Sequence, residues 1–155
     1  MQTFFHVTTT DHHIGTELQP GRFGAAVRSS LVKQTAVDVH ALNTLAWESA
    51  LEVARRCVAP SAPSRLSCVF GTPTHEEAKQ FQQRYRVGSH IFAISVPNST
   101  PIHLADFESI TTTIAGKPFL DTFVDGAIGY WKNTPENTLQ EVIVGGPATL
   151  LAKIR

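Results

Sequence analysis

Each end of the chain carries an apolar segment that contains a single ionisable residue. Residues 3–8 (TFFHVT) surround His6 with aromatic and β-branched side chains, and residues 139–146 (LQEVIVGG) place Glu141 directly before three β-branched residues. Because such residues favour strands, both segments are predicted to lie in β-sheet. An ionisable group in an apolar strand is unfavourable unless it has a partner or a function. His6 and Glu141 are therefore the first candidate functional residues.

The length and charge of the chain limit what it can be. Its 155 residues are enough for one domain with a core and too few for two of ordinary size, so residues 1–155 are expected to form a single domain. The 13 basic and 13 acidic residues cancel, so the net charge indicates neither a nucleic-acid nor a membrane partner. No leader-like segment opens the chain, and no apolar stretch approaches the roughly 20 residues of a membrane span. We expect a cytoplasmic protein without a membrane partner.

The order of the expected elements is that of an α+β domain. Residues 9–36 lack periodicity and are expected to form a long loop, in which the glycines of residues 21–24 would permit close approach to a ligand. Thr74 and Glu77 have the spacing of a capping box at a helix start. Apolar periodicity and turn residues predict helices over residues 38–57, 75–86 and 119–131, and strands over residues 64–70, 90–96, 102–104, 139–144 and 149–154.

Common catalytic and cofactor-binding motifs are absent from the sequence. There is no Walker loop, no GxGxxG after a strand, no HExxH, no paired CxxC and no GxSxG. Of the seven histidines, His12 and His13 are adjacent on a polar segment and the others lack the spacing of metal ligands. We therefore expect no metal site.

Several short motifs carry a resemblance to a known family. Residues 5–8 (FHVT), followed by residues 18–21 (LQPG), resemble the opening of small ADP-ribosyltransferases, including the rifampin-modifying enzymes. Residues 69–94 are similar to the strand, helix and strand in the middle of that fold, and residues 141–144 (EVIV) to its acidic strand. The resemblance implies two small antiparallel sheets around an NAD cleft with flanking helices. An uncharacterised bacterial family is also similar at Glu52, Arg55, residues 63–65, residues 69–70 and residues 130–131.

The resemblance implies a role for each candidate residue. Glu141 would be catalytic, because a carboxylate near the developing ribose cation stabilises the transition state more than the substrate. His6 would bind the adenosine ribose and orient NAD, and Arg22 or Arg65 would bind the pyrophosphate. Ser67 would replace the Tyr or the Ser-Thr-Ser run that the family usually has on its nicotinamide-facing strand. Stacking on nicotinamide is expected from Phe70, Tyr130 or Trp131.

The same residues also have structural interpretations. Glu141 could be an outward-pointing charge that protects an edge strand from aggregation. His6 could be a core residue whose ring is satisfied by a backbone carbonyl. Arg65 could simply pair with Glu48 or Glu52 of the preceding helix.

The expected function is transfer of ADP-ribose from NAD to an acceptor. Leu139 stands two residues before Glu141, where arginine-modifying members of the family carry Glu or Gln, so arginine is not expected as the acceptor. The remaining candidate acceptors are a nucleic-acid base, another side chain, a small molecule or water. An enzyme of this kind would fit a toxin, a defence factor or a resistance enzyme. An antitoxin or immunity protein would then be a possible partner. One alternative is a non-catalytic member that binds a nucleotide or a protein. Another is an RNA 2′-phosphotransferase, which would require Arg22, Arg28, Arg65 and His6 to converge.

Overall fold

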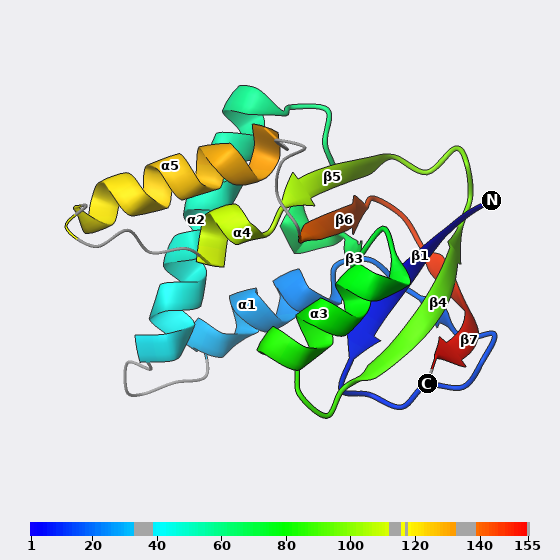
Figure 1. Ribbon diagram of the computed structural model, residues 1–155. Coiled ribbons are helices and arrows are strands. Elements are labelled where there is room, and N and C mark those ends of the chain that lie inside the picture. Colours follow the sequence, from blue (N-terminus) through cyan, green and yellow to red (C-terminus); the bar gives the residue numbers. More distant parts are fainter. Residues whose placement is uncertain (33–38, 112–115, 117, 133–138, 155) are drawn as a thin grey trace.

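The computed structural model describes residues 1–32, 39–111, 116, 118–132 and 139–154. Its strands gather on one side of the molecule, and α2, α4 and α5 lie on the other (Figure 1). The helices are α1 (Arg22–Val32), α2 (Val39–Val58), the 3₁₀ helix η1 (Arg65–Ser67), α3 (His75–Tyr85), α4 (Glu108–Thr111) and α5 (Phe119–Lys132). The strands are β1 (Gln2–Thr8), β2 (Glu17–Leu18), β3 (Val69–Gly71), β4 (His90–Val96), β5 (Ile102–Asp106), β6 (Gln140–Val144) and β7 (Ala148–Ile154).

The larger sheet contains four antiparallel strands in the order β1-β4-β7-β2. β1 pairs with β4 along its whole length, with Phe5 opposite Ala93. β7 lies on the other side of β4, and the register of this pair shifts between Ala93 and Ile94. Such an irregularity bends a strand and increases its twist. The short β2 covers only the start of β7.

The smaller sheet has the order β3-β6-β5, also antiparallel. It meets the larger sheet at one isolated bridge between β1 and the end of β3. There the Phe5 amide donates to the Thr72 carbonyl at 3.0 Å, and the Thr72 amide donates to the Phe5 carbonyl at 2.8 Å. This bridge brings the first strand of the chain close to the sheet that contains β6.

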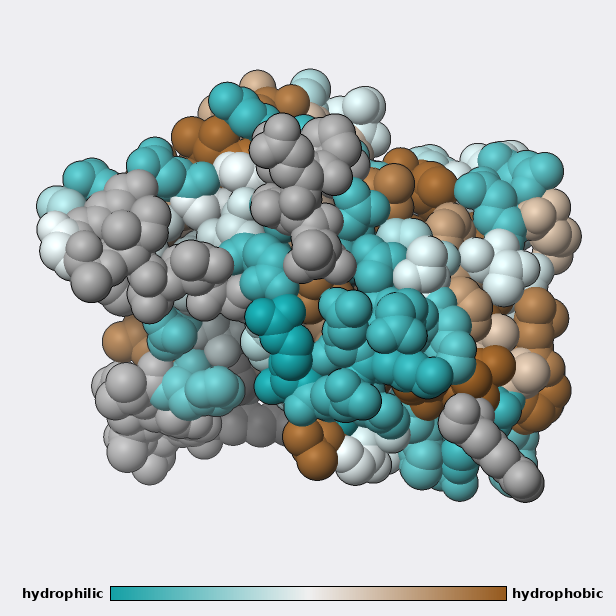
Figure 2. Space-filling view, viewed as in Figure 1, coloured by the Kyte–Doolittle hydropathy of each residue, from teal (hydrophilic) through white to brown (hydrophobic). Residues whose placement is uncertain are grey.

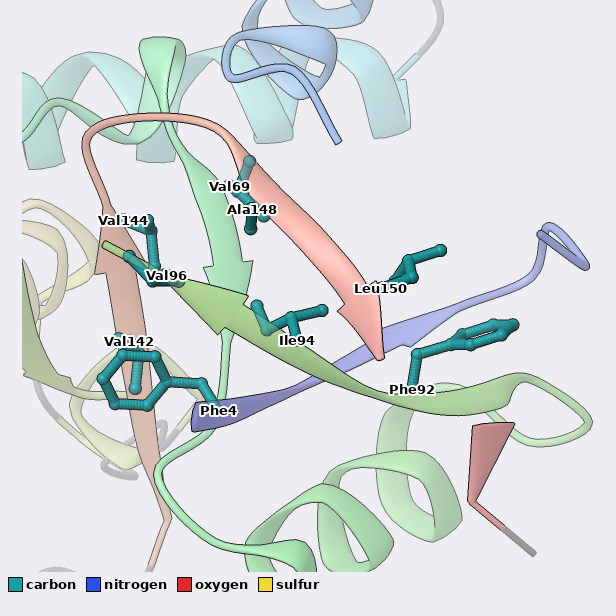
Figure 3. Close-up of a cluster of buried hydrophobic side chains, with 9 residues drawn as sticks. All are labelled: Phe4, Val69, Phe92, Ile94, Val96, Val142, Val144, Ala148 and Leu150. Atoms are coloured by element: carbon teal, nitrogen blue, oxygen red, sulfur yellow. The ribbon is translucent and has the colours of Figure 1, made fainter. Parts of the chain in front are cut away.

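Apolar side chains from both sheets form one core (Figure 3). Side chains alternate between the two faces of a strand. Val142 and Val144 of β6 accordingly pack into this core, whereas Ile143 packs against the helices on the opposite face. Glu141 has the same parity as Ile143, so it also faces the helices. The labelled members of the core are Phe4, Val69, Phe92, Ile94, Val96, Val142, Val144, Ala148 and Leu150.

A second core lies between β6 and the helices α2 and α5. Trp131 of α5 is 2% exposed, and its indole N–H donates to the Leu51 carbonyl of α2 at 2.7 Å. Nearer the other end of the two helices, the rings of Trp47 and Phe123 lie 4.1 Å apart. Within the part of the chain that the structure describes, no helix has both the length and the apolarity to cross a membrane.

Helix α3 packs its inner side against the strands and exposes a polar side. Ala78 is fully buried, while Glu76, Gln83 and Arg84 are exposed. The surface over α3 is correspondingly hydrophilic near the centre of Figure 2. The start of α3 confirms the predicted capping box in part, because Thr74 Oγ1 accepts a hydrogen bond from the Glu77 amide at 3.2 Å. The Glu77 carboxylate instead accepts hydrogen bonds from the Thr74 hydroxyl and from the Gln140 amide.

The predicted α+β class is confirmed, and so are most of the expected elements. Two expectations were wrong. Residues 9–36 are not one long loop, because they contain β2 and α1, while residues 33–36 lie outside the described residues. Residues 64–70 are not one strand, because Ser64 caps the turn of η1 by accepting from the Leu66 amide at 3.2 Å, and only then does β3 begin.

Candidate functional site

A cavity of about 520 Å³, here called the first cavity, lies where the two sheets meet the helices. β1 lines it with His6, α2 with Glu48 and β6 with Glu141. Apolar walls with a few ionisable groups are typical of ligand-binding pockets. The aromatic residues of the wall are Phe5, Phe23, Trp47, Phe70, Phe81, Tyr85 and Phe107.

Four polar side chains, Glu48, Arg65, Tyr130 and Glu141, form a buried charge cluster beside this cavity. Arg65 Nε donates to Glu48 Oε2 at 3.0 Å, and Arg65 Nη2 donates to Glu48 Oε1 at 3.0 Å. Arg65 Nη1 donates to the Tyr130 hydroxyl oxygen and to Glu141 Oε2, and the Tyr130 hydroxyl donates to the same Oε2. The three ionic side chains are at most 10% exposed.

Arg65 is held both by charge and by aromatic rings. Its guanidinium carbon lies 4.8 Å from the ring centroid of Phe70 and 4.9 Å from that of Tyr130. Burial opposes the charged form, but Glu141, Tyr130 and Glu48 outweigh it and raise the pKa of Arg65 well above its ordinary value. Burial also raises the pKa of Tyr130, so its hydroxyl keeps the proton that it donates. With both carboxylates ionised, the cluster has two negative charges and one positive.

The Glu141 carboxylate is fixed through only one of its oxygens. Arg65 and Tyr130 both donate to Oε2, and no donor among the described residues reaches Oε1. Glu141 also lines the first cavity, where its side chain is 10% exposed. The arrangement immobilises the carboxylate and leaves one oxygen free to accept a hydrogen bond from a ligand.

The ring of His6 provides a second free hydrogen-bond acceptor atom. Its Nδ1 lies 2.8 Å from the Phe70 carbonyl oxygen, which can only accept, so the proton of the neutral ring is on Nδ1. Burial lowers the pKa of His6, although the hydrogen bond to Phe70 acts in the opposite direction. The ring is therefore neutral at pH 7, and Nε2 is an acceptor.

A second cavity, of about 360 Å³, adjoins the first and shares five lining residues with it, among them His6, Phe70 and Arg86. Arg22, the first residue of α1, also lines it. His12 lies on its wall as well, and the buried Nε2 of this ring has no hydrogen-bond partner in the described part of the chain. No acidic residue is found among the described residues that line this cavity. The two adjoining cavities thus differ in charge.

A family model matches residues 7–155 of the chain. The chain belongs to DUF2441, a family of proteins of unknown function. The match includes all four members of the buried charge cluster and begins one residue after His6. No curated protein matches the sequence.

The structure brings some of the residues singled out in the sequence together and separates others. His6, Phe70 and Glu141 line the first cavity, and Arg22 lines the second. Ser67 is exposed on η1, and Trp131 is buried in the second core; neither lines either cavity. Neither side chain lies where the predicted contact with a ligand would place it, because η1 turns Ser67 outward and Trp131 packs between α2 and α5.

The contacts of the cluster bear on two further candidate residues. Arg65 lines the first cavity, but its guanidinium is directed at Glu48 and Glu141, which with Tyr130 accept from Nε, Nη1 and Nη2 and leave at most one N–H for a pyrophosphate. Tyr130 is fully buried and lines neither cavity, so its ring is not an open stacking surface. The alternative pairing of Arg65 with Glu48 is confirmed.

Three residues that line the cavities were not predicted as ligand-binding or catalytic from the sequence: Glu48, Arg86 and His12. Helical periodicity puts Glu48 on the polar side of α2 with Glu52, yet Glu48 is 5% exposed and Glu52 is half-buried in ion pairs with Arg55 and Arg56. No local pattern distinguishes the two glutamates. No group of three His, Cys, Asp or Glu side chains suited to a metal ion occurs in the part of the chain that the structure describes.

Proposed function

We propose that this protein is an ADP-ribosyltransferase-like enzyme that binds NAD across the two cavities and transfers its ADP-ribose to an acceptor. The observation that carries the proposal is that Glu141 Oε1 and His6 Nε2, two free acceptor atoms from different sheets, belong to residues lining one cavity. Hydrogen-bond acceptor atoms of this kind suit the hydroxyl groups of a ribose, which donate hydrogen bonds. The two antiparallel sheets that meet beside the cavity also agree with the fold that the sequence resemblance implies.

The charge of the two cavities supports NAD as the ligand. Oxidised NAD has a positively charged nicotinamide ring at one end and a negatively charged pyrophosphate in its middle. The first cavity is lined by the buried carboxylates Glu48 and Glu141, and the second by Arg22 without an acidic residue among its described lining, while Arg86 lines both. Nicotinamide and its ribose would occupy the first cavity, and the pyrophosphate and adenosine would extend towards the second.

Glu141 would act on the bond between nicotinamide and ribose. When this bond breaks, its electron pair leaves with the nicotinamide nitrogen, and positive charge develops on the ribose. A fixed carboxylate near that charge stabilises the transition state more than the substrate. The acceptor then forms a bond to the ribose carbon and releases a proton to solvent. His6, neutral and held by Phe70, would orient the dinucleotide without transferring a proton.

Release of nicotinamide from NAD tests the proposal. The wild-type protein should release nicotinamide, with cell lysate supplying an acceptor, and Glu141→Gln should reduce the rate by about a hundredfold or more, as expected when charge stabilisation is lost. Glu52→Gln is the matched control, because Glu52 lines neither cavity. No nicotinamide release with or without lysate, or equal rates for wild type and Glu141→Gln, would overturn the enzymatic proposal.

A second candidate is a non-catalytic protein that binds a nucleotide at the same site. The observation in its favour is that Glu141 already has a structural partner in Arg65, so its presence in this pocket does not require catalysis to satisfy its charge. Calorimetry that detects binding of NAD without nicotinamide release would support it. The RNA 2′-phosphotransferase alternative has less support, because Arg65 faces carboxylates and Arg28 lines neither cavity.

A further inference from the structure

The buried charge cluster contains one more carboxylate than its fixed geometry requires. Arg65 alone could hold Glu141 through Nη1, with Tyr130 as the second donor. Both oxygens of Glu48 nevertheless accept hydrogen bonds from Nε and Nη2 on the other edge of the guanidinium. The Glu48 side chain is only 6% exposed. Burying an additional ion is unfavourable by itself. A purely structural cluster would therefore be better served by a neutral residue at this position.

Glu48 changes the net charge of the site. Without it, Arg65 would neutralise Glu141, and the wall of the first cavity would present no net charge to a ligand. With it, the cluster keeps an excess negative charge in a region where low exposure weakens solvent screening. Glu48 also lines the first cavity itself.

The other ionisable residues of the wall do not cancel this charge. His6 is neutral, because burial lowers its pKa. His40 and Arg86 also line the first cavity, but both are exposed, so water and salt screen them more strongly than the cluster. The cavity is therefore negative at its buried wall.

We propose that Glu48 is a specificity-determining residue that makes the first cavity select the positively charged, oxidised form of a nicotinamide ring. The inference rests on the proposed function, since it names the feature by which NAD⁺ is chosen over NADH. The two dinucleotides have the same pyrophosphate and adenosine, and the reduced ring lacks the positive charge. A site that used only shape and stacking would distinguish them less.

Equilibrium binding of NAD⁺ and NADH to the full chain tests this role. The wild-type protein should bind NAD⁺ at least tenfold more tightly than NADH. Glu48→Gln should reduce the ratio of the two affinities on the order of tenfold, as expected for the loss of one partly screened charge. The reduction should come mainly from weaker binding of NAD⁺. Glu48→Asp keeps the charge and should keep the preference, and Glu52→Gln should leave the ratio unchanged. Nicotinamide release is followed in the same samples, so that loss of NAD⁺ by turnover is corrected.

Each outcome is decisive. If both dinucleotides bind with equal affinity to the wild-type protein, or if Glu48→Gln keeps the full preference for NAD⁺, this inference is wrong while the proposed function stands. If neither dinucleotide binds, the proposed function fails and this inference fails with it. The comparison of NAD⁺ and NADH affinities needs only the wild-type protein, so the proposal can be refuted even if Glu48→Gln does not fold.

Discussion

Replacing Arg65 with Met tests how the buried charge cluster contributes to stability. The change removes the cation and leaves Glu48 and Glu141, whose side chains are 6% and 10% exposed, without a charged partner. Removing one partner from a buried ion pair typically destabilises a protein by about 3–5 kcal/mol. In a domain of this size 1 kcal/mol corresponds to roughly 2–4 °C in Tm, so we expect Tm to fall by roughly 6–20 °C.

Urea unfolding followed by far-UV circular dichroism measures the effect, and Arg84→Met provides a matched control. Arg84 also forms an ion pair, 2.5 Å from Glu108, but its side chain is 49% exposed. Exposed pairs contribute about 0–1 kcal/mol. A loss for Arg65→Met as small as that of the control would refute the description of the cluster as a buried, mutually dependent unit.

A double variant separates the charge effect from lost packing. Adding Glu48→Gln to Arg65→Met removes one of the two stranded charges, so the double variant should be more stable than Arg65→Met alone. Strictly additive effects of the two substitutions would show that Glu48 and Arg65 do not interact in the folded protein.

Three further predictions concern single residues. Hydrogen bonding from Arg55, opposed by partial burial, lowers the pKa of Glu52 to about 2 from its ordinary 4.5. Its stabilisation should therefore be present above pH 4.5 and be lost as the pH falls towards 2, and Glu52→Gln should flatten the stability curve in this window. Burial lowers the pKa of His6 below 6.5, so its contribution should be complete above pH 6.5 and decline below it, and a nitrogen NMR titration should show the Nδ1–H form at neutral pH. Gly24→Ala should destabilise the fold by about 1–3 kcal/mol in urea unfolding, because the new Cβ would lie 2.0 Å from the Leu66 carbonyl oxygen; no loss would mean that α1 does not pack this closely.

The elements that could be predicted are those specified by neighbouring residues. The start of α3 follows from Thr74, whose hydroxyl caps the helix three residues away. β6 follows from its β-branched residues, and its two-residue alternation explains why Glu141 and Val142 face different surroundings. Helix α1 was missed because its contact with η1 depends on Gly24, which meets Leu66, a residue distant in the sequence.

The charge cluster illustrates what the local sequence leaves undetermined. Arg65 could have paired with Glu48 or Glu52, which are one helical turn apart and chemically identical. The choice depends on how α2 lies against η1 and β6, which is a matter of tertiary packing. His6 and Glu141 could be selected because an ionisable residue stands out in an apolar strand, whereas Glu48 could not be selected because it resembles the solvated glutamates of any helix.

The cluster consists of residues 48, 65, 130 and 141. Two of its hydrogen bonds connect residues that are far apart in the sequence: Arg65 and Tyr130 are separated by 65 positions, and Arg65 and Glu141 by 76. No fragment of the chain that stops before β6 contains the complete set. A product truncated in this region, by proteolysis or by premature termination, would lack the group proposed for catalysis. The activity proposed above would therefore require a chain that extends through β6, and shorter products of synthesis or degradation would be inert.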